Sequence, residues 1–176
     1  DRWMQTLLQR DTDVGLYLLF QLATNSPVGY SASHALVSAV LCHLIAVELK
    51  VSTPERDALV HAALTMNIAM TALQDQLAGQ VDRPSIAQME AIRVHASKGG
   101  LMLANLHVKD ELWLDIVTSH HDESGNSGLL SLMQPTGRLS RILRVVDRYA
   151  AMISPRKSRA GRSATDSVRS IISSAP

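Results

Sequence analysis

The feature that most constrains the fold is a long apolar segment with a helical repeat. Its sequence is SASHALVSAVLCHLIAVELK, residues 31–50. Residues that share one helical face recur in it at steps of three and four: His34, Val37, Leu41, Ile45 and Glu48. Only 3% of the chain is aromatic, which disfavours a sheet rich in Tyr, Phe and Trp. The segment therefore predicts packed helices with an aliphatic core.

Most of the remaining chain shows the same period. A helix start is predicted at Ser52-Thr53-Pro54-Glu55 and a capping box at Ser85 with Gln88. A loop with Gly and Pro breakers is expected over 76–85. We expect one all-α domain, a helical bundle of seven or eight helices, without strands or internal repeats. The expected helices cover 14–24, 31–50, 54–72, 85 through His95 with a break at Gly99-Gly100, 101–107, 109–121, 136–153 and 164–173.

Charge and cysteine content restrict the class of protein. The net charge is +1, so no overall field favours nucleic acid, and no DNA partner is expected. Cys42 is the only cysteine, which excludes a disulfide framework and points to a reducing cytoplasm. The apolar run 35–47 is too short to span a bilayer, so no membrane span is expected. Residues 1–27 are expected to be N-terminal helices that link the domain 28–176 to a longer chain, or that dimerise.

Histidines are the main chemical resource of the chain, which has seven. Imidazoles bind transition metals, and carboxylates often complete such sites. Two of them are adjacent in VTSHHDESGNSGLL, residues 117–130. Adjacent residues on a helix point about 100° apart, so both reach one centre only where the helix unwinds. The alternative is that this pair only caps or solvates a helix end.

The order of these residues resembles a known family. One His stands early on a helix, one lies mid-chain in RVHASKG, a pair follows in SHHDESG, and an Asp comes later in VVDRYAAM. This pattern is similar to the HD superfamily of metal-dependent phosphohydrolases, and within it to the HD-GYP branch, over roughly residues 28–172. The resemblance implies vestigial metal ligands at His34, His95, His120, His121 and Asp147. It also places phosphate-binding cations in ISPRKSR, at Arg156 and Arg159.

The chain departs from the family pattern at its most important positions. The name-giving His-Asp pair is Met66-Asn67, within AALTMNIAMTAL, and Met70 stands where the family has its lysine. Tyr30 occupies a position where this branch often has a ligand Glu, and Asp122 replaces the usual Glu after the histidine pair. The Gly-Tyr-Pro motif reads Gly128-Leu129-Leu130.

These departures predict a loss of hydrolysis. Met is a poor ligand for a hard or borderline cation, and the neutral amide of Asn67 cannot bridge two cations as a carboxylate does. Two ions held a few ångströms apart would repel each other without that bridge. We expect no two-metal centre and favour no cofactor, with one Fe, Mn or Zn ion at the histidine cluster left open. The other interpretation is that the histidines are relics that hydrogen-bond in a polar pocket.

Three functional interpretations follow. The first is a catalytically inactive bacterial signalling domain that resembles a cyclic di-GMP phosphodiesterase and acts through a protein partner or an attached domain, with a homodimer left open. The second is an active phosphodiesterase with a reduced metal centre. The third is a nucleotide-binding effector in which Arg156 and Arg159 hold the phosphates of a cyclic dinucleotide. A related output-domain branch without hydrolase residues is a further alternative.

Overall fold

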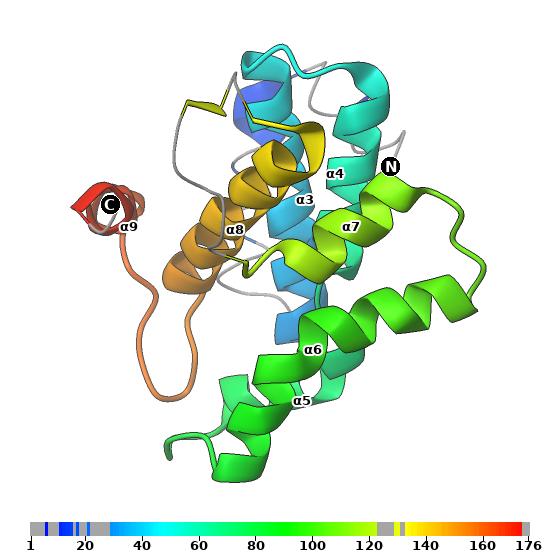
Figure 1. The fold of residues 1–176 in the computed structure, drawn as a ribbon. Coiled ribbons are helices and arrows are strands. Elements are labelled where there is room, and N and C mark those ends of the chain that lie inside the picture. The colour runs from blue at the N-terminus through cyan, green and yellow to red at the C-terminus, as the bar shows by residue number, and fades with distance from the viewer. Residues whose placement is uncertain are drawn as a thin grey trace.

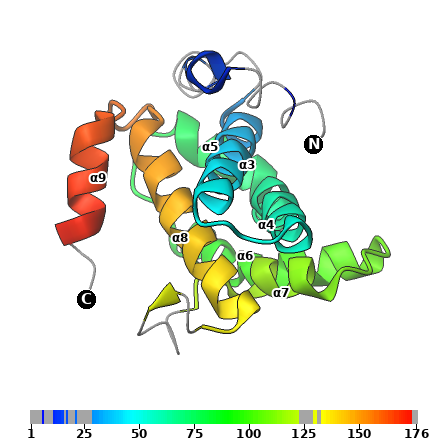
Figure 2. The same ribbon diagram turned by 90° about the horizontal axis from the view of Figure 1, so that it is seen from above.

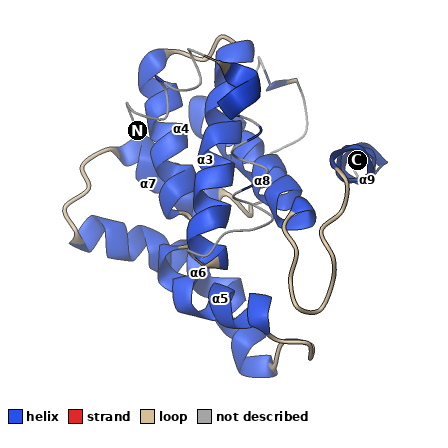
Figure 3. Cartoon of the chain, turned by 180° about the vertical axis from the view of Figure 1, so that it is seen from behind, coloured by secondary structure: helices blue, strands red, loops and turns tan. Residues whose placement is uncertain are grey.

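The regular structure of the chain is helical (Figure 3). The computed structural model describes residues 6, 11–15, 17, 21, 29–122, 129, 130 and 133–173. Within this part seven α-helices and one short 3-10 helix form, and no strand does, apart from an isolated bridge between Arg156 and Arg159. The predicted all-α class is therefore confirmed. Most of the helix predicted over 14–24 lies outside the described residues.

The helices pack around a central pair. Helix α3, Tyr30–Glu48, packs along α4, Thr53–Thr65. Helices α7, Glu111–Ser119, and α8, Pro135–Ile153, pack against this pair and against each other. Helix α6, Ile86–Asn105, crosses α7, and α5, Thr71–Gly79, packs on α3, while α9, Ala164–Ser173, stands beyond α8 (Figures 1 and 2).

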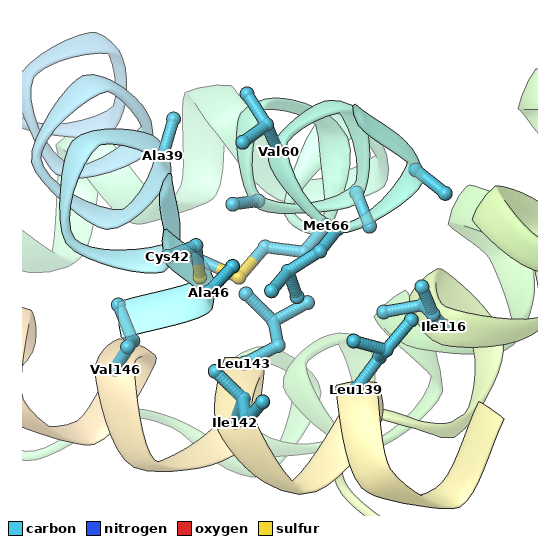
Figure 4. Close-up of a cluster of buried hydrophobic side chains, with 14 of the residues drawn as sticks. Ala39, Cys42, Ala46, Val60, Met66, Ile116, Leu139, Ile142, Leu143 and Val146 are labelled. Carbon is cyan, nitrogen blue, oxygen red and sulfur yellow. The ribbon is translucent and has the colours of Figure 1, made fainter. Parts of the chain in front are cut away.

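The core is aliphatic, as the composition predicts. Apolar side chains from α3, α4, α7 and α8 meet in one cluster, and Met66, Cys42 and Leu143 point toward one another within it (Figure 4). On α8 the buried apolar residues lie on one face at helical spacing, which is the expected amphipathic period. They are Leu139, Ile142, Leu143, Val146, Ala150 and Ile153.

Helix α3 is long and apolar because it is the central core helix. Among the described residues it alone has the length and composition of a membrane span, with a mean hydropathy of 1.6 over 18 residues. Half of this window is buried within the bundle, as in a core helix of a globular protein. The expectation that the apolar run is too short therefore underestimated its length, since α3 has 19 residues. Its burial against α4, α5 and α8 accounts for its composition.

The prediction of one continuous helix over 54–72 is wrong, because the helix is interrupted near its middle. It begins as expected, with Ser52 as N-cap, but the Ser52 hydroxyl donates to the Glu55 carboxylate at 2.8 Å and makes no cap bond to the backbone. The α-helix then ends at Thr65, and a 3-10 helix η1, Ile68–Met70, leads into α5. Asn67 interrupts the helix with φ −104° and ψ 14°, a conformation outside the α region. Helix α5 reaches Gly79, so the following loop starts later than predicted.

The break predicted at Gly99-Gly100 is also wrong, because α6 runs through it. Its start is the expected capping box. The backbone N–H of Gln88 donates to the Ser85 hydroxyl, and the backbone N–H of Ser85 donates to the side-chain oxygen of Gln88. Glycine in a helix interior costs about 1 kcal/mol relative to Ala, but here it permits a close helix crossing. A Cβ atom built on Gly100 would lie 2.2 Å from Cγ2 of Thr118 on α7.

Two helices end in the same left-handed cap. Lys50 after α3 and His107 after α6 have φ values of 54° and 62°, the two positive values found among described residues other than glycine. Behind them the Val51 amide donates to the Ala46 carbonyl at 2.9 Å, and the Val108 amide donates to the Leu103 carbonyl at 3.1 Å. This is the Schellman arrangement, in which glycine is the usual residue.

Candidate metal centre

Helices α6 and α7 bring three of the predicted ligands together. His95 comes from the middle of α6, and His120 and His121 follow the last residue of α7. One ring nitrogen from each of the three histidines lies within 4.8 Å of the others. Both imidazoles of an adjacent pair reach one centre only where the helix unwinds, and α7 does end directly before His120 and His121. The rings stack edge to face or tilted, with centroids 4.1–5.3 Å apart.

Backbone carbonyls fix the orientation of two rings. Nδ1 of His95 lies 2.5 Å from the Ile92 carbonyl, and Nδ1 of His120 lies 2.7 Å from the Val117 carbonyl. A carbonyl oxygen only accepts, so Nδ1 carries the proton in each ring. In the neutral ring the Nε2 atom then has a lone pair. This is the arrangement by which outer-shell partners orient histidines that bind metals.

The spacing of the two Nε2 atoms suits one tetrahedral ion. They lie 3.3 Å apart. Two nitrogens that are each 2.0–2.1 Å from a tetrahedral zinc ion are roughly 3.3–3.4 Å from each other. Without a cation or a shared proton, two lone pairs face each other at this distance. The triad of His95, His120 and His121 can therefore hold a metal ion, and the chemistry of its donors fits one transition metal.

Two imidazoles of the triad, those of His120 and His121, have lowered pKa values. Burial, aided by the neighbouring His121, lowers the pKa of His120 to about 4. The pKa of His121 is lowered by partial desolvation and by the nearby His95 and Arg144, although Asp147 raises it. Ligand nitrogens must be deprotonated to bind a metal. At neutral pH His120 and His121 therefore meet that condition in the metal-free chain.

The other two predicted ligands form a separate pair beside the triad. Nε2 of His34, on α3, lies 2.8 Å from a carboxylate oxygen of Asp147, on α8. Burial raises the pKa of Asp147, but the hydrogen bond and charge of His34 outweigh it and lower that pKa below its usual value. His34 is buried, and its Nδ1 has no hydrogen-bond partner within the described part of the chain. The carboxylate is close enough to act on the pKa values of His120 and His121.

Tyr30 connects this pair to the predicted basic turn. Its ring stacks on His34, with centroids 5.7 Å apart and planes 12° apart. Its hydroxyl accepts hydrogen bonds from two nitrogens of Arg156, at 2.8 and 3.2 Å. Residues 156–159 form a tight turn, in which the Arg156 and Arg159 backbones bond each other, and the Lys157 amide donates to the Ala78 carbonyl of α5. One predicted phosphate contact, Arg156, therefore reaches the site through Tyr30.

Arg159, the other predicted phosphate contact, closes the end of α8 instead. Its guanidinium donates to the carbonyls of Ala151, Met152 and Ser154. Its pKa is lowered, first by desolvation and then by the charges of Arg156 and Arg162. Several of its donors are thus directed at the backbone, which the sequence pattern did not predict.

The positions that depart from the family pattern do not supply anionic ligands to the triad. Met66 is buried in the apolar core, with 1% of its surface exposed. Asn67 is buried at the turn after it, and Met70 ends η1 partly exposed. Asp122 is exposed, and its carbonyl accepts from Arg144. Leu129 is exposed and Leu130 half-buried, while Gly128 lies outside the described residues. Among the described residues the close ligand group contains no carboxylate.

The remaining histidines lie away from the triad. His43 is buried, with a lowered pKa caused first by desolvation, and its Nδ1 has no partner among the described residues. His61 packs its ring against Trp113 at 4.9 Å. His107 is the exposed cap of α6 described above. None of these three histidines belongs to the close ligand group of His95, His120 and His121.

Sequence reasoning missed the residues that hold the site in place. The Ser119 hydroxyl bonds the Ser140 hydroxyl at 2.8 Å and ties the end of α7 to α8. The Ile92 and Val117 carbonyls carry no residue-type signal. Gly100 did carry a signal, since a glycine in a helical pattern marks either a break or a close approach. Comparison of the chain with protein-family models, with curated proteins and with solved structures gave no match.

Proposed function

We propose that the chain is a catalytically inactive signalling domain of HD-GYP type that binds a single transition metal ion. Its triad of His95, His120 and His121 holds the ion, and the domain acts by binding a protein partner, an attached domain or a cyclic dinucleotide. The order of His34, the triad and Asp147 along the chain supports the family, and the all-α bundle is compatible with it. A reducing cytoplasm suits the single, fully buried thiol of Cys42.

One observation carries this proposal: the described site offers three imidazoles for one ion, and its carboxylate, Asp147, is paired with His34 and not placed between two ions. The triad is made of three imidazoles. Asp147 is engaged by His34, and the pair at the family's His-Asp position consists of a core methionine and an amide. Two cations in one site would therefore repel each other with little compensation. A two-metal clamp on phosphate, with its activated water, does not follow from these residues.

The metal component is tested by elemental analysis of protein purified without chelator or nickel resin. We expect close to one equivalent of a transition metal per chain. His120→Ala is expected to lose it because one of the three donors is removed, whereas His107→Ala is expected to keep it because that exposed histidine lies two residues after the end of α6 and outside the triad. Two equivalents, or none, would contradict the single-ion site.

The inactive character is tested with cyclic di-GMP under added iron or manganese. We expect no linear product above a blank without protein. Calorimetry on the same samples then tests nucleotide binding, with Arg156→Ala as the variant, because Arg156 is the basic-turn arginine linked through Tyr30 to His34. Heat from wild type that is lost in this variant would assign the nucleotide as the ligand. A flat trace from wild type would leave the protein partner or attached domain as the signalling route.

The second candidate is an active phosphodiesterase with a reduced centre. It is favoured by one observation, the carboxylate of Asp147 beside the histidines, with its lowered pKa. In that case His34 would release Asp147 when an ion binds. Turnover that disappears in both His120→Ala and Asp147→Asn would establish this candidate and overturn the proposed inactivity.

A further inference from the structure

We infer that Gly100 is a positioning residue of the metal centre: its contact with Thr118 sets the distance between α6 and α7, and thereby the distance between His95 and His120. The inference rests on the single-ion site proposed above. It adds a residue that donates no ligand and that lies on a different turn of α6 from His95.

The first step is that α6 and α7 touch at the glycine pair. Gly99 and Gly100 are both buried in the middle of α6. A Cβ atom on Gly99 would lie 3.5 Å from Ile68 and from Val117, which is ordinary contact. A Cβ atom on Gly100 would lie only 2.2 Å from Cγ2 of Thr118. Residue 99 can therefore accept a methyl group, and residue 100 cannot do so without movement.

The second step is that the contact lies next to the two ligands along both helices. His95 is little more than one helical turn before Gly100 on α6, and His120 follows Thr118 by two residues. His95 and Gly99 stand four residues apart, so they share the face of α6 that meets α7. A change in helix separation at the crossing is thus carried directly to the Nε2 atoms, which are 3.3 Å apart.

The third step is that Thr118 resists displacement. Its hydroxyl donates to the Leu114 and Asp115 carbonyls, at 3.1 and 3.0 Å, which favours its present rotamer. If that rotamer is kept, ordinary carbon–carbon contact requires the helices to separate by roughly 1 Å or more. Metal–ligand distances tolerate only about ±0.2 Å. The expected displacement is several times larger than a bound ion permits.

The test compares Gly100→Ala with Gly99→Ala in the full chain, with cobalt(II) as the probe. The two variants make the same chemical change on adjacent residues of one helix, and both add a better helix former. We expect Gly100→Ala to bind cobalt at least about tenfold more weakly, or with an altered ligand-field spectrum, as loss of a supporting group typically does. Gly99→Ala is expected to match wild type in both affinity and spectrum.

A rescue variant separates positioning from a general loss of stability. Thr118→Ser removes Cγ2 and keeps the hydroxyl, so Gly100→Ala combined with Thr118→Ser should recover the wild-type cobalt spectrum and affinity. Equal cobalt binding by Gly100→Ala and wild type would overturn the inference. So would a double variant that remains as weak as Gly100→Ala.

A measurement without metal keeps this result distinct from failure of the single-ion site. In metal-free protein, NMR contacts between the His95 and His120 rings should be present in wild type and in Gly99→Ala, and lost or weakened in Gly100→Ala. If wild type binds no cobalt but this pattern appears, the metal proposal fails and the positioning role stands. Ring contacts that survive unchanged in Gly100→Ala would remove the positioning role whatever the metal result.

Discussion

At the scale of single residues, the neutral state of His120 links folding to pH. Its folded pKa is about 4, against about 6.5 for an unperturbed histidine. The unfolded chain therefore binds a proton that the folded chain does not, and acidification favours unfolding. The stabilising contribution is complete above about pH 6.5 and falls by up to about 1.4 kcal/mol per pH unit as the pH is lowered toward 4.

The measurement is the free energy of unfolding of metal-free protein by denaturant at several pH values. The slope between pH 6.5 and 4 should be shallower in His120→Gln, which cannot titrate, than in wild type. His107→Gln, at an exposed histidine, serves as the matched control and should retain the wild-type slope. Parallel curves for wild type and His120→Gln would contradict the neutral, buried imidazole.

Met66 tests whether the family's histidine position has become part of the core. The side chain is buried next to Cys42 and Leu143 (Figure 4). Met66→His is expected to lower the free energy of unfolding by roughly 1–3 kcal/mol, because it buries a polar ring among apolar groups. Met66→Leu keeps the volume and should cost less than about 1.5 kcal/mol. A Met66→His variant as stable as Met66→Leu would mean that this side chain faces a polar space.

At the scale of elements, the two left-handed helix caps are positions of avoidable strain. A residue with a Cβ atom loses roughly 1 kcal/mol in this conformation, which glycine adopts freely. His107→Gly is therefore expected to raise the free energy of unfolding by up to about 1 kcal/mol in urea denaturation. Lys98→Gly, in the exposed interior of α6, should instead lower it by about the same amount. If both variants changed the free energy of unfolding in the same direction, the strain assigned to the left-handed cap at His107 would be contradicted.

At the scale of the whole molecule, positive charge is concentrated in the C-terminal part of the sequence, from residue 135 onward. Residues 135–176 hold nine Lys and Arg against two Asp, a net charge of +7, whereas residues 1–134 have a net charge of −6. Local fields of this kind decide binding to charged surfaces more than net charge does. We expect the chain to be retained by a cation exchanger at pH 7.5 despite a net charge of only +1.

Two charge reversals of equal size test this division. The variants are Arg148→Glu and Arg93→Glu. Arg148 lies on the solvent face of α8, and Arg93 lies on α6, where it pairs with Glu90. The first should elute at clearly lower salt than the second. Equal shifts would show that only the net charge matters. The effect should weaken as ionic strength rises, because the Debye length falls below about 10 Å.

The sequence could predict what depends on periodicity and composition. The helical class, the starts of α4 and α6 and the amphipathic α8 all follow from repeats and caps that a linear pattern carries. The end of α4 at Thr65 has no signal in that pattern, and the continuity of α6 through Gly100 goes with a close crossing of α7 that a linear pattern does not carry. The same limit applies to the site. Residue order identified the histidines, but the carbonyls that orient them and the engagement of Arg159 appear only in three dimensions.

The converging lone pairs of His95 and His120 affect which metal ion the site would prefer. Nitrogen donors without a carboxylate favour copper and zinc over manganese or iron, following the general order of divalent affinities. Within a cell, the ligand type and geometry of the site and the supply of each ion would then together decide which metal binds.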